Sequence, residues 1–212
     1  MEKLFDFKQK KALKNREIFI KCRGILIRDT SLISKYCDIE KVEIACKSGC
    51  VNYGKKWSCP PYARKFTSLS AQYSKAILLV FSTETKYYLD IKNKYTAIKA
   101  ANVTLKTYIE KCARSIEESI DGYSLLSGSC RLCKKCACKV EEKCRKPEKM
   151  RYSLEATGID VVQMCNDLLG FKLLWYTDKT LPEYTSTVSM IMFNDDKEKE
   201  EIVNVVLDVI NK

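Results

Sequence analysis

The sequence predicts an α+β domain, in which a small mixed β-sheet packs with helices and carries two cysteine-rich loops. The chain has 212 residues and is 46% hydrophobic, with only 7 glycines and 4 prolines, as is typical of an ordered globular protein. Short aliphatic runs are interspersed with segments of three- and four-residue periodicity. Most of the 12 cysteines fall at about residues 37–66 and 128–147. Because this length suits one compact core, we expect residues 1–212 to form a single domain.

The N-terminal half predicts five segments in order. The lysine-rich residues 1–15 have few apolar positions and suggest an exposed helix. Residues 18–27 read as a strand or short core segment, whereas the glycines and paired prolines within 37–66 predict a loop. The aliphatic run 76–81 predicts a buried strand, and the helical periodicity of 94–120 predicts a long amphipathic helix.

The C-terminal half predicts further alternation of strands and helices. The expected elements are a strand at 123–126, helices at 147–157 and 159–169, and strands at 171–176 and 187–193. A C-terminal helix should follow, with Asn194, Asp195 and Asp196 as cap residues.

The cellular compartment decides how the cysteines are interpreted. No aliphatic run approaches the ~20 residues needed to span a membrane, and the N-terminus lacks the apolar segment of a secretory signal, so we expect a cytoplasmic protein. In a reducing cytosol, clustered cysteines bind metal or carry out redox chemistry. The absence of histidine excludes Cys/His zinc sites and Ser-His-Asp triads. Cys112 and Cys165 are exceptions, since they occupy apolar helical positions typical of the core.

The second loop carries the strongest motif. Cys130, Cys133, Cys136 and Cys144 have the spacing C-x2-C-x2-C-x7-C. Three cysteines at three-residue intervals let one loop wrap around an inorganic core, and a distant fourth completes the set, which predicts a [4Fe-4S] cluster. Structural zinc is the alternative, although zinc ribbons usually separate two cysteine pairs by a dozen or more residues. Cys138 could replace Cys136 as the third ligand.

The residues after Cys144 are suited to an anionic group. If Pro147 opens a helix, the positive end of that helix would point toward the cluster. Arg145, Lys146 and Lys149 would add positive charge, and Arg145 adjoins a ligand, so we expect it to contact the cofactor. The alternative is that the lysines form only a solvated face.

The first loop offers a second site. Cys46, Cys50 and Cys59 lie among glycines and prolines that stiffen the chain, and they could hold a second cluster. With three protein ligands, one iron would remain open to a substrate. Cys37 or Cys22 could instead supply a fourth ligand and close the site, and unligated thiols are a third possibility. The nearby groups able to exchange protons are Tyr53, Lys55 and Tyr62.

Three motifs together resemble a known family. They are Cys46-x3-Cys50-x2-Tyr53-Gly54-Lys55 leading to Cys59-Pro60-Pro61-Tyr62, Cys130-Arg-Leu-Cys133-x2-Cys136 leading to Cys144-Arg-x-Pro147-Glu148, and Ser153-Leu-Glu155-Ala156-x-Gly158-Ile159-Asp160-Val161. The chain thereby resembles the prokaryotic predicted metal-binding proteins known as domain of unknown function 2284. The resemblance implies a cysteine-bound metal centre, in which the 130–144 cysteines match ferredoxin-like ligands and those of 46–59 match the other set. Cys138 departs from the pattern, and the resemblance implies no reaction.

Three functions are compatible with these features. The first is an iron–sulfur protein with one or two [4Fe-4S] clusters, acting in electron transfer or as a redox component with an unknown redox partner. The second is an enzyme that uses the open iron to activate a small-molecule substrate, as a desulfurase or lyase. The third is a zinc-stabilised binding module. The formal charge of +11 is compatible with nucleic acid, but two clusters would reduce it to roughly +8, and the lysines are scattered, which disfavours that partner. No membrane association is expected.

Overall fold

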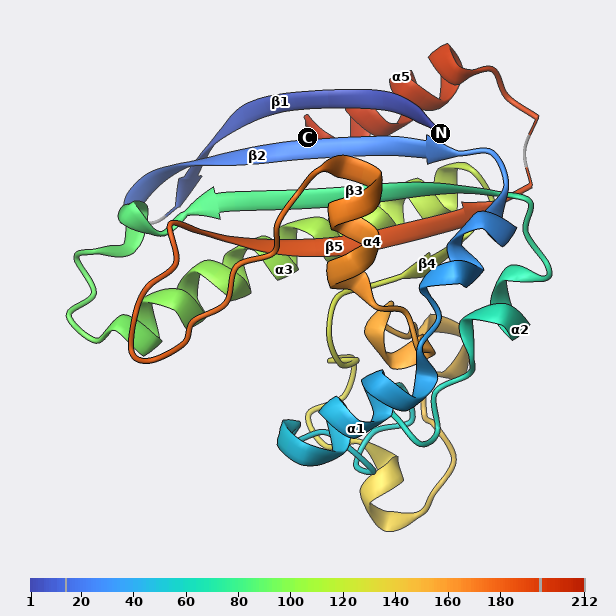
Figure 1. The fold of residues 1–212 in the computed structure, drawn as a ribbon, viewed down its shortest axis with the longest axis horizontal. Coiled ribbons are helices and arrows are strands. Elements are labelled where there is room, and N and C mark those ends of the chain that lie inside the picture. The colour runs from blue at the N-terminus through green and yellow to red at the C-terminus, as the bar shows by residue number, and fades with distance from the viewer. Residues whose placement is uncertain (14, 195, 212) are drawn as a thin grey trace.

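A computed structural model describes residues 1–212 except 14, 195 and 212, and shows a five-stranded antiparallel sheet with the order β1-β2-β3-β5-β4 (Figure 1). The strands are β1 (Glu2–Leu13), β2 (Arg16–Ile27), β3 (Lys75–Glu84), β4 (Tyr123–Leu125) and β5 (Tyr184–Phe193). The helices are α1 (Ile39–Gly49), α2 (Phe66–Ser70), α3 (Lys94–Ser119), α4 (Val161–Leu169) and α5 (Lys199–Ile210). The predicted α+β class is confirmed, and each pairing between these strands is antiparallel.

Each face of the sheet has its own hydrophobic core. In Figure 1, α3 and α5 lie behind the sheet and α4 lies in front of it. Ile77 and Phe81 of β3 belong to the core beneath α3 and α5, whereas Leu78 and Val80 belong to the core on the α4 face. Because successive strand residues point to opposite faces, an aliphatic run such as that of β3 fits a strand covered on both sides.

The longer predicted elements are confirmed. The strands at 18–27, 76–81 and 187–193 appear as β2, β3 and β5, and the short strand at 123–126 appears as β4. The periodic segment 94–120 forms α3, which buries its apolar stripe on the sheet. At α4, the Asp160 carboxylate accepts the Gln163 amide at the start, and Gly170 ends the helix with a positive φ of 56°.

The predicted N-terminal helix is wrong, because residues 2–13 form the edge strand β1. Its side chains alternate between more and less exposed positions, and Phe5 and Phe7 are two residues apart, which is the period of a strand. Pairing with β2 places the lysines of β1 at the sheet edge, where charge discourages association with another strand.

Three other predicted elements also differ. The segment 37–66 is not a loop throughout, since Asp38 caps the helix α1 by accepting the Lys41 amide. The predicted helix at 147–157 is replaced by one-turn 3-10 helices at Pro147–Lys149 and Glu155–Thr157. Residues 171–176 form no strand; Phe171 and Leu173 are buried in the α4-side core, but the backbone is irregular.

The C-terminal helix α5 is confirmed, but its predicted caps are not. The residue preceding α5 is Glu198, which makes no side-chain cap. Asn194 instead accepts the Ser74 amide (2.8 Å), and Asp196 pairs with Lys75 (3.0 Å), so both fasten the end of β5 to the start of β3. Asp195 lies outside the described residues.

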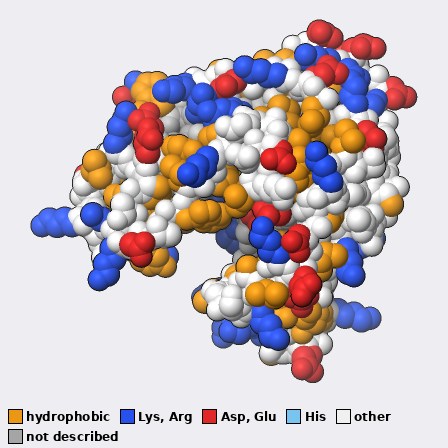
Figure 2. Space-filling model, in the orientation of Figure 1, with side chains coloured by type: hydrophobic (Ala, Val, Ile, Leu, Met, Phe, Trp, Pro, Cys, Tyr) orange, Lys and Arg blue, Asp and Glu red, His pale blue; other side chains and the backbone are white. Residues whose placement is uncertain are grey.

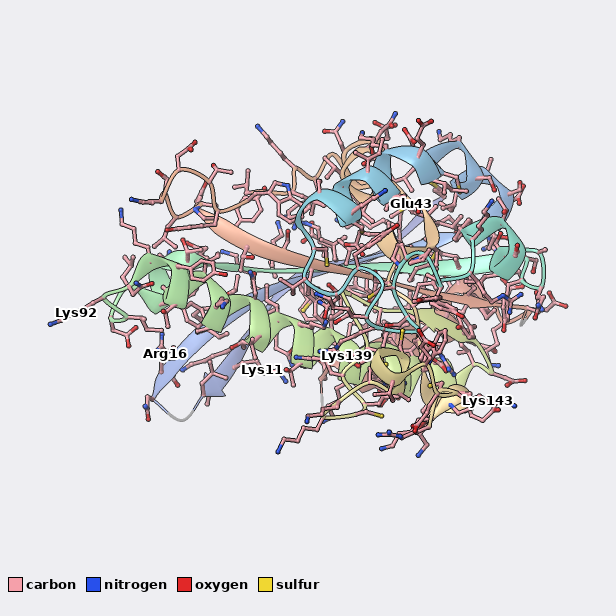
Figure 3. All side chains as sticks on the ribbon, turned by 90° about the horizontal axis from the view of Figure 1, so that it is seen from below. Lys11, Arg16, Glu43, Lys92, Lys139 and Lys143 are labelled. Atoms are coloured by element: carbon pink, nitrogen blue, oxygen red, sulfur yellow. The ribbon has the colours of Figure 1, made fainter. Side chains whose placement is uncertain are left out.

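Two long connections position the cysteines. The first cysteine segment (residues 37–66) lies between β2 and β3, and the second cysteine segment (residues 128–147) lies between β4 and β5. Both run below the sheet in Figure 1 and form a protruding lobe in Figure 2. Figure 3 views the molecule from this side, with Glu43 on α1 and Lys139 and Lys143 on the second segment. Among the described helices, none has the length and apolar character to cross a membrane.

Candidate metal centre

The second cysteine segment wraps around a small cavity of about 20 Å³. Its chain is largely irregular and contains a one-turn 3-10 helix at Ala137–Val140. The lining includes all four cysteines of the predicted motif: Cys130, Cys133, Cys136 and Cys144. Each is partly buried. Burial raises the pKa of the Cys130 thiol, so binding of a cation there must displace a proton. The fold therefore brings the four predicted ligands to one shared interior.

Cys136 and Cys138 occupy different environments. Cys136 lines the cavity, whereas the Cys138 thiol is buried and donates to the Gly54 carbonyl at 3.9 Å. Cys136 immediately precedes the 3-10 helix, and Cys138 lies within it, so the turn of this helix points the two side chains in different directions. The geometry thus favours Cys136 over Cys138 as the third thiol of the set.

One polar stripe of α3 holds both ends of the second cysteine segment. The contacts are Lys106 Nζ to the Ser129 carbonyl (3.2 Å), Arg131 to the Glu110 carboxylate (3.1 Å), Arg114 to the Lys149 carbonyl (3.1 Å) and Arg151 Nε to the Glu117 carboxylate (2.9 Å). The helical members recur every three or four residues and therefore share a face. Burial lowers the pKa of Lys106, the first member.

This polar stripe of α3 was not predicted from the sequence. The periodicity of residues 94–120 places the charged residues opposite the apolar stripe but gives them no role. Glu117 differs from an ordinary exposed helix residue only in the structure, where it is buried and also accepts the Ser124 amide at 3.1 Å. The polar face of a helix can therefore anchor a loop whose own backbone forms few regular hydrogen bonds.

The three cysteines of the first segment also gather. Cys46 lies in α1, Cys50 directly follows that helix, and Cys59 is buried in the following turns. Burial raises the pKa of Cys59; the Ser58 hydroxyl lowers it, and the neighbouring Cys50 and Cys46 thiols raise it further. Burial likewise raises the pKa of Cys46, with Cys50 as the next contributor. The three thiols are therefore electrostatic neighbours, as a common site requires.

Cys22 does not supply a fourth thiol to this set. It is fully buried in the core beneath α3, where burial raises its pKa to about 12 and Cys112 is its neighbour. Cys37 packs against the core on the α4 face of the sheet, and its backbone forms an isolated antiparallel β-bridge with Ile159. The prediction that Cys112 and Cys165 are core residues is confirmed, since both are buried in the hydrophobic cores. This burial raises their pKa values to about 11 and about 12.

The two cysteine segments contact each other directly. Lys56 Nζ donates to the Cys130 carbonyl (2.7 Å), and the Cys130 amide donates to Ser58 Oγ (3.0 Å). Ser58 Oγ also lies 3.9 Å from Cys59 Sγ, so this hydroxyl stands between the two sets. Trp57 lines the cavity and donates to the Glu142 carbonyl at 2.9 Å. Sequence reasoning treated the loops separately and missed these residues, because contacts 70 to 90 positions apart leave no local pattern.

The predicted helix dipole at the second set is wrong, because Pro147 opens only a single 3-10 turn. Positive charge is nevertheless present: Arg145 and Lys146 line the cavity, and Arg145 pairs with Glu142 at 3.1 Å on the exposed side. Lys149 contributes through its carbonyl, which accepts from Arg114. Any electrostatic support for an anion there comes from side chains rather than from a helix terminus.

A larger pocket of about 500 Å³ adjoins the first set. Cys46 and Cys50 line one wall, and Glu155 lies beside Cys46. Burial raises the pKa of Glu155, while its hydrogen bonds and Lys106 lower it less. In the sequence, Glu155 stands out only as part of a motif, and no local pattern indicates its place beside a thiol.

The predicted proton-exchanging groups have mainly structural contacts. Tyr53 donates to the Glu43 carboxylate at 3.1 Å, and burial followed by this bond raises its pKa. Tyr62 packs edge-on against Trp57, with ring centroids 4.8 Å apart. The Lys55 amide donates to the Asn52 carbonyl in a tight turn. Tyr53 thus braces α1, and Tyr62 braces the tryptophan that reaches the second segment.

In the part of the chain that the structure describes, no three Cys, Asp or Glu side chains are placed to hold a single metal ion. No curated protein and no solved structure shows significant similarity to the chain. The family described as "Predicted metal-binding protein (DUF2284)" matches residues 33–193, a span that contains both cysteine sets and the 3-10 turn that carries Glu155. Since this match covers most of the chain, the protein belongs to the DUF2284 family of predicted metal-binding proteins.

Proposed function

We propose that this protein is a cytoplasmic iron–sulfur protein that holds a [4Fe-4S] cluster at Cys130, Cys133, Cys136 and Cys144 and acts in electron transfer. The observation that carries the proposal is that these four thiols line one cavity while Cys138 faces away from it. The described cysteines are free thiols rather than disulfides, in keeping with a reducing compartment. Its partner would be a redox protein or a small substrate.

The donor set fits an iron–sulfur cluster. All four groups are thiols, which are the ligands of such clusters, and three come from a C-x2-C-x2-C run. When bound, the cluster accepts and releases single electrons. The chain holds it with four thiolates, excludes bulk water by partial burial, and places Arg145 and Lys146 where positive charge stabilises the more negative, reduced state.

A second centre at Cys46, Cys50 and Cys59 would lie next to the first. Ser58 contacts both Cys59 and the backbone of Cys130, and Lys56 donates to the carbonyl of Cys130. The Ser58 hydroxyl therefore connects the two sets. Such proximity suits a protein that passes electrons from a closed four-thiolate centre to a second centre.

The pocket favours a second candidate function, an enzyme of desulfurase or lyase type. Three cysteines leave one iron of a [4Fe-4S] cluster without a protein ligand, and an open position distinguishes catalytic metal sites from structural ones. Two of the three thiols border a pocket large enough for a small molecule. The electron-transfer and enzyme proposals are compatible, because they concern different cysteine sets of the same chain.

Anaerobic purification followed by iron and acid-labile sulfide analysis tests the proposal. We expect roughly eight irons per chain for two clusters, or roughly four for the Cys130–Cys144 set alone. Zinc without sulfide would refute the proposal and support a zinc-stabilised binding module.

A matched pair of variants assigns the ligands. Cys136→Ser should lose roughly four irons, because it removes a thiol from the cavity, whereas Cys138→Ser should retain all of them. The reverse result would exchange the two roles. Full iron retention in both variants would contradict the four-cysteine site.

A further inference from the structure

The pocket beside the first cysteine set has two chemically different walls. Cys46, Cys50 and Glu155 supply polar groups on one side. The remaining wall is largely hydrophobic and comes from α1, from α4 with the residues just before it, and from the segment after α4: Val42, Ala45, Ile159, Val161, Val162, Leu173 and Trp175. Figure 2 shows a recess bordered by hydrophobic side chains above the lobe that carries α1. A molecule in this pocket would meet thiols at one end and apolar side chains along its body.

We propose that this pocket binds a small, uncharged organic thiol, with its apolar body against α4 and Trp175 and its sulfur directed to the Cys46/Cys50 side. The inference rests on the proposed three-thiolate iron centre and specifies the class of molecule that would occupy its open position. The pocket volume of about 500 Å³ lies in the ~300–1,000 Å³ range of small-molecule sites.

The charged residues of the pocket argue against a charged ligand. Lys41 and Asp160 form an ion pair with each other at 2.5 Å, and Asp160 also accepts the Gln163 amide as the cap of α4. Neither group needs a counter-ion from a ligand. The Glu155 carboxyl lies on the thiol side and supplies no positive charge to a ligand carboxylate.

The preference for sulfur follows from the metal chemistry. Iron in a thiolate-bound cluster takes soft sulfur donors readily, whereas an alcohol is a poorer ligand for it. A thiol would bind as its thiolate and release its proton to solvent. Because Cys50 is exposed and Cys46 partly buried, this side of the site is reachable from the pocket.

Two adjacent residues of α1 provide a matched test. Ala45 lines the pocket, whereas Ile44 is 60% exposed and lies outside its lining. The residues of α1 in the lining share one helix face, and residue 44 falls outside that face. Ala45→Phe should therefore fill the pocket, whereas Ile44→Phe places the same aromatic side chain in solvent.

The experiment uses the iron-loaded protein, purified without oxygen, with benzyl mercaptan and benzyl alcohol as probes. Isothermal titration calorimetry should show at least tenfold tighter binding of the thiol, equivalent to about 1.4 kcal/mol. The thiol, but not the alcohol, should change the visible absorption of the iron centre. Ala45→Phe should weaken thiol binding at least tenfold, and Ile44→Phe should leave it within about twofold.

Several results would overturn the inference. They are equal affinity for the two probes, an unchanged visible spectrum with the thiol, or thiol binding that Ala45→Phe leaves intact. Iron analysis separates this failure from failure of the proposed function. A wild-type protein that holds iron lost in Cys59→Ser but binds no thiol refutes only the pocket ligand, whereas a protein with no such iron refutes the three-thiolate centre.

Discussion

The two cysteine sets differ in how the chain encloses them. Cys130, Cys133, Cys136 and Cys144 come from one irregular segment around a cavity of about 20 Å³. Cys46, Cys50 and Cys59 come from a helix, its end and a buried turn, beside a pocket of about 500 Å³. The contrast is one between an enclosed set of thiols and a set that borders an open pocket, and it supports the proposed division between an electron-transfer centre and a ligand-binding centre.

The supports of the two sets also differ. The second segment is fastened to α3 by the stripe from Lys106 to Glu117, which reaches the residues on both sides of the cavity. The first cysteine segment depends on α1, which has no buried residues. The residue before α1, Asp38, donates its amide to the carbonyl of Gly158, which ends the 3-10 turn at 155–157 (2.8 Å). We therefore expect the closed set to be coupled to the sheet core and the open set to be separable from it.

The largest expected effect is at Glu117, which joins the closed set to the core. Its side chain and that of Arg151 are only 10% and 14% exposed, so Glu117→Ala would leave a buried guanidinium without its carboxylate. Loss of one partner of a buried pair costs about 3–5 kcal/mol. We expect urea unfolding to show a loss of this size, together with loss of iron from the Cys130–Cys144 set.

Glu110→Ala is the matched control for Glu117→Ala. Glu110 lies on the same stripe and pairs with Arg131, but that arginine is 41% exposed, so the expected loss is at most about 1 kcal/mol. Equal losses for the two variants would show that the stripe does not anchor the segment through Glu117.

Two glycines test whether the open set is separable. Gly158 has a φ of 96°, and a Cβ there would lie 2.7 Å from Ile39 Cγ1 at the start of α1. Gly158→Ala should therefore displace α1, destabilise the protein by about 1–3 kcal/mol and release iron from Cys46, Cys50 and Cys59 only. Differential iron analysis of wild type and variant, read with electron paramagnetic resonance, measures this selectivity.

Gly49→Ala should raise the stability of the protein, whereas Gly158→Ala should lower it. Gly49 ends α1 and a Cβ there would meet no atom within 4 Å, so alanine should stabilise the helix by about 0.5–1 kcal/mol. If Gly158→Ala emptied both sets of iron, the two sets would not be supported independently. Equal destabilisation by Gly49→Ala would show that the loss at residue 158 does not come from its contact with Ile39.

The framework and the cysteine motifs are readable from the sequence because they leave local patterns. The β3 run, the α3 periodicity and the C-x2-C-x2-C spacing each lie within a few turns or residues. The edge strand β1 was misread because its lysines outweighed the two-residue spacing of Phe5 and Phe7. At a sheet edge, charge and strand formation are compatible, so hydrophobicity alone underestimates such strands.

The rest of the candidate site could not be read in this way. Ser58, Trp57 and Lys56 are ordinary residues whose importance lies in contacts with the second segment. The pocket likewise combines α1 with Leu173 and Trp175, which are more than 120 positions away in the chain. These relations depend on how the sheet brings its connections together, and a single sequence carries no local signal for them.

A change at Ser58 tests whether the two cysteine sets influence each other, and we expect its effect on stability to be smaller. It is buried, and Ser58→Ala removes the acceptor of the Cys130 amide, for an expected loss of about 1 kcal/mol. If the hydroxyl links the two centres, the reduction potentials of both should shift in redox titrations. Ser48→Ala is the control, because the Ser48 hydroxyl is exposed and bonds only within α1. A shift confined to the Cys130–Cys144 centre would mean that Ser58 supports that set alone.

The smallest expected effect is at Arg145. It distinguishes the influence of a charge at the cavity of the closed set from that of the net charge of the lobe. Arg145 lines the cavity, so Arg145→Gln should lower the reduction potential of the Cys130–Cys144 centre by at most about 40 mV, the equivalent of ~1 kcal/mol in a solvent-like dielectric. Stability should change by less than about 1 kcal/mol, since the pair with Glu142 is exposed. Lys143→Gln removes the same charge from a residue outside the lining and should shift the potential less. Equal shifts for the two variants would assign the effect to the net charge of the lobe, because only a charge placed at the cavity can favour one centre over its neighbour.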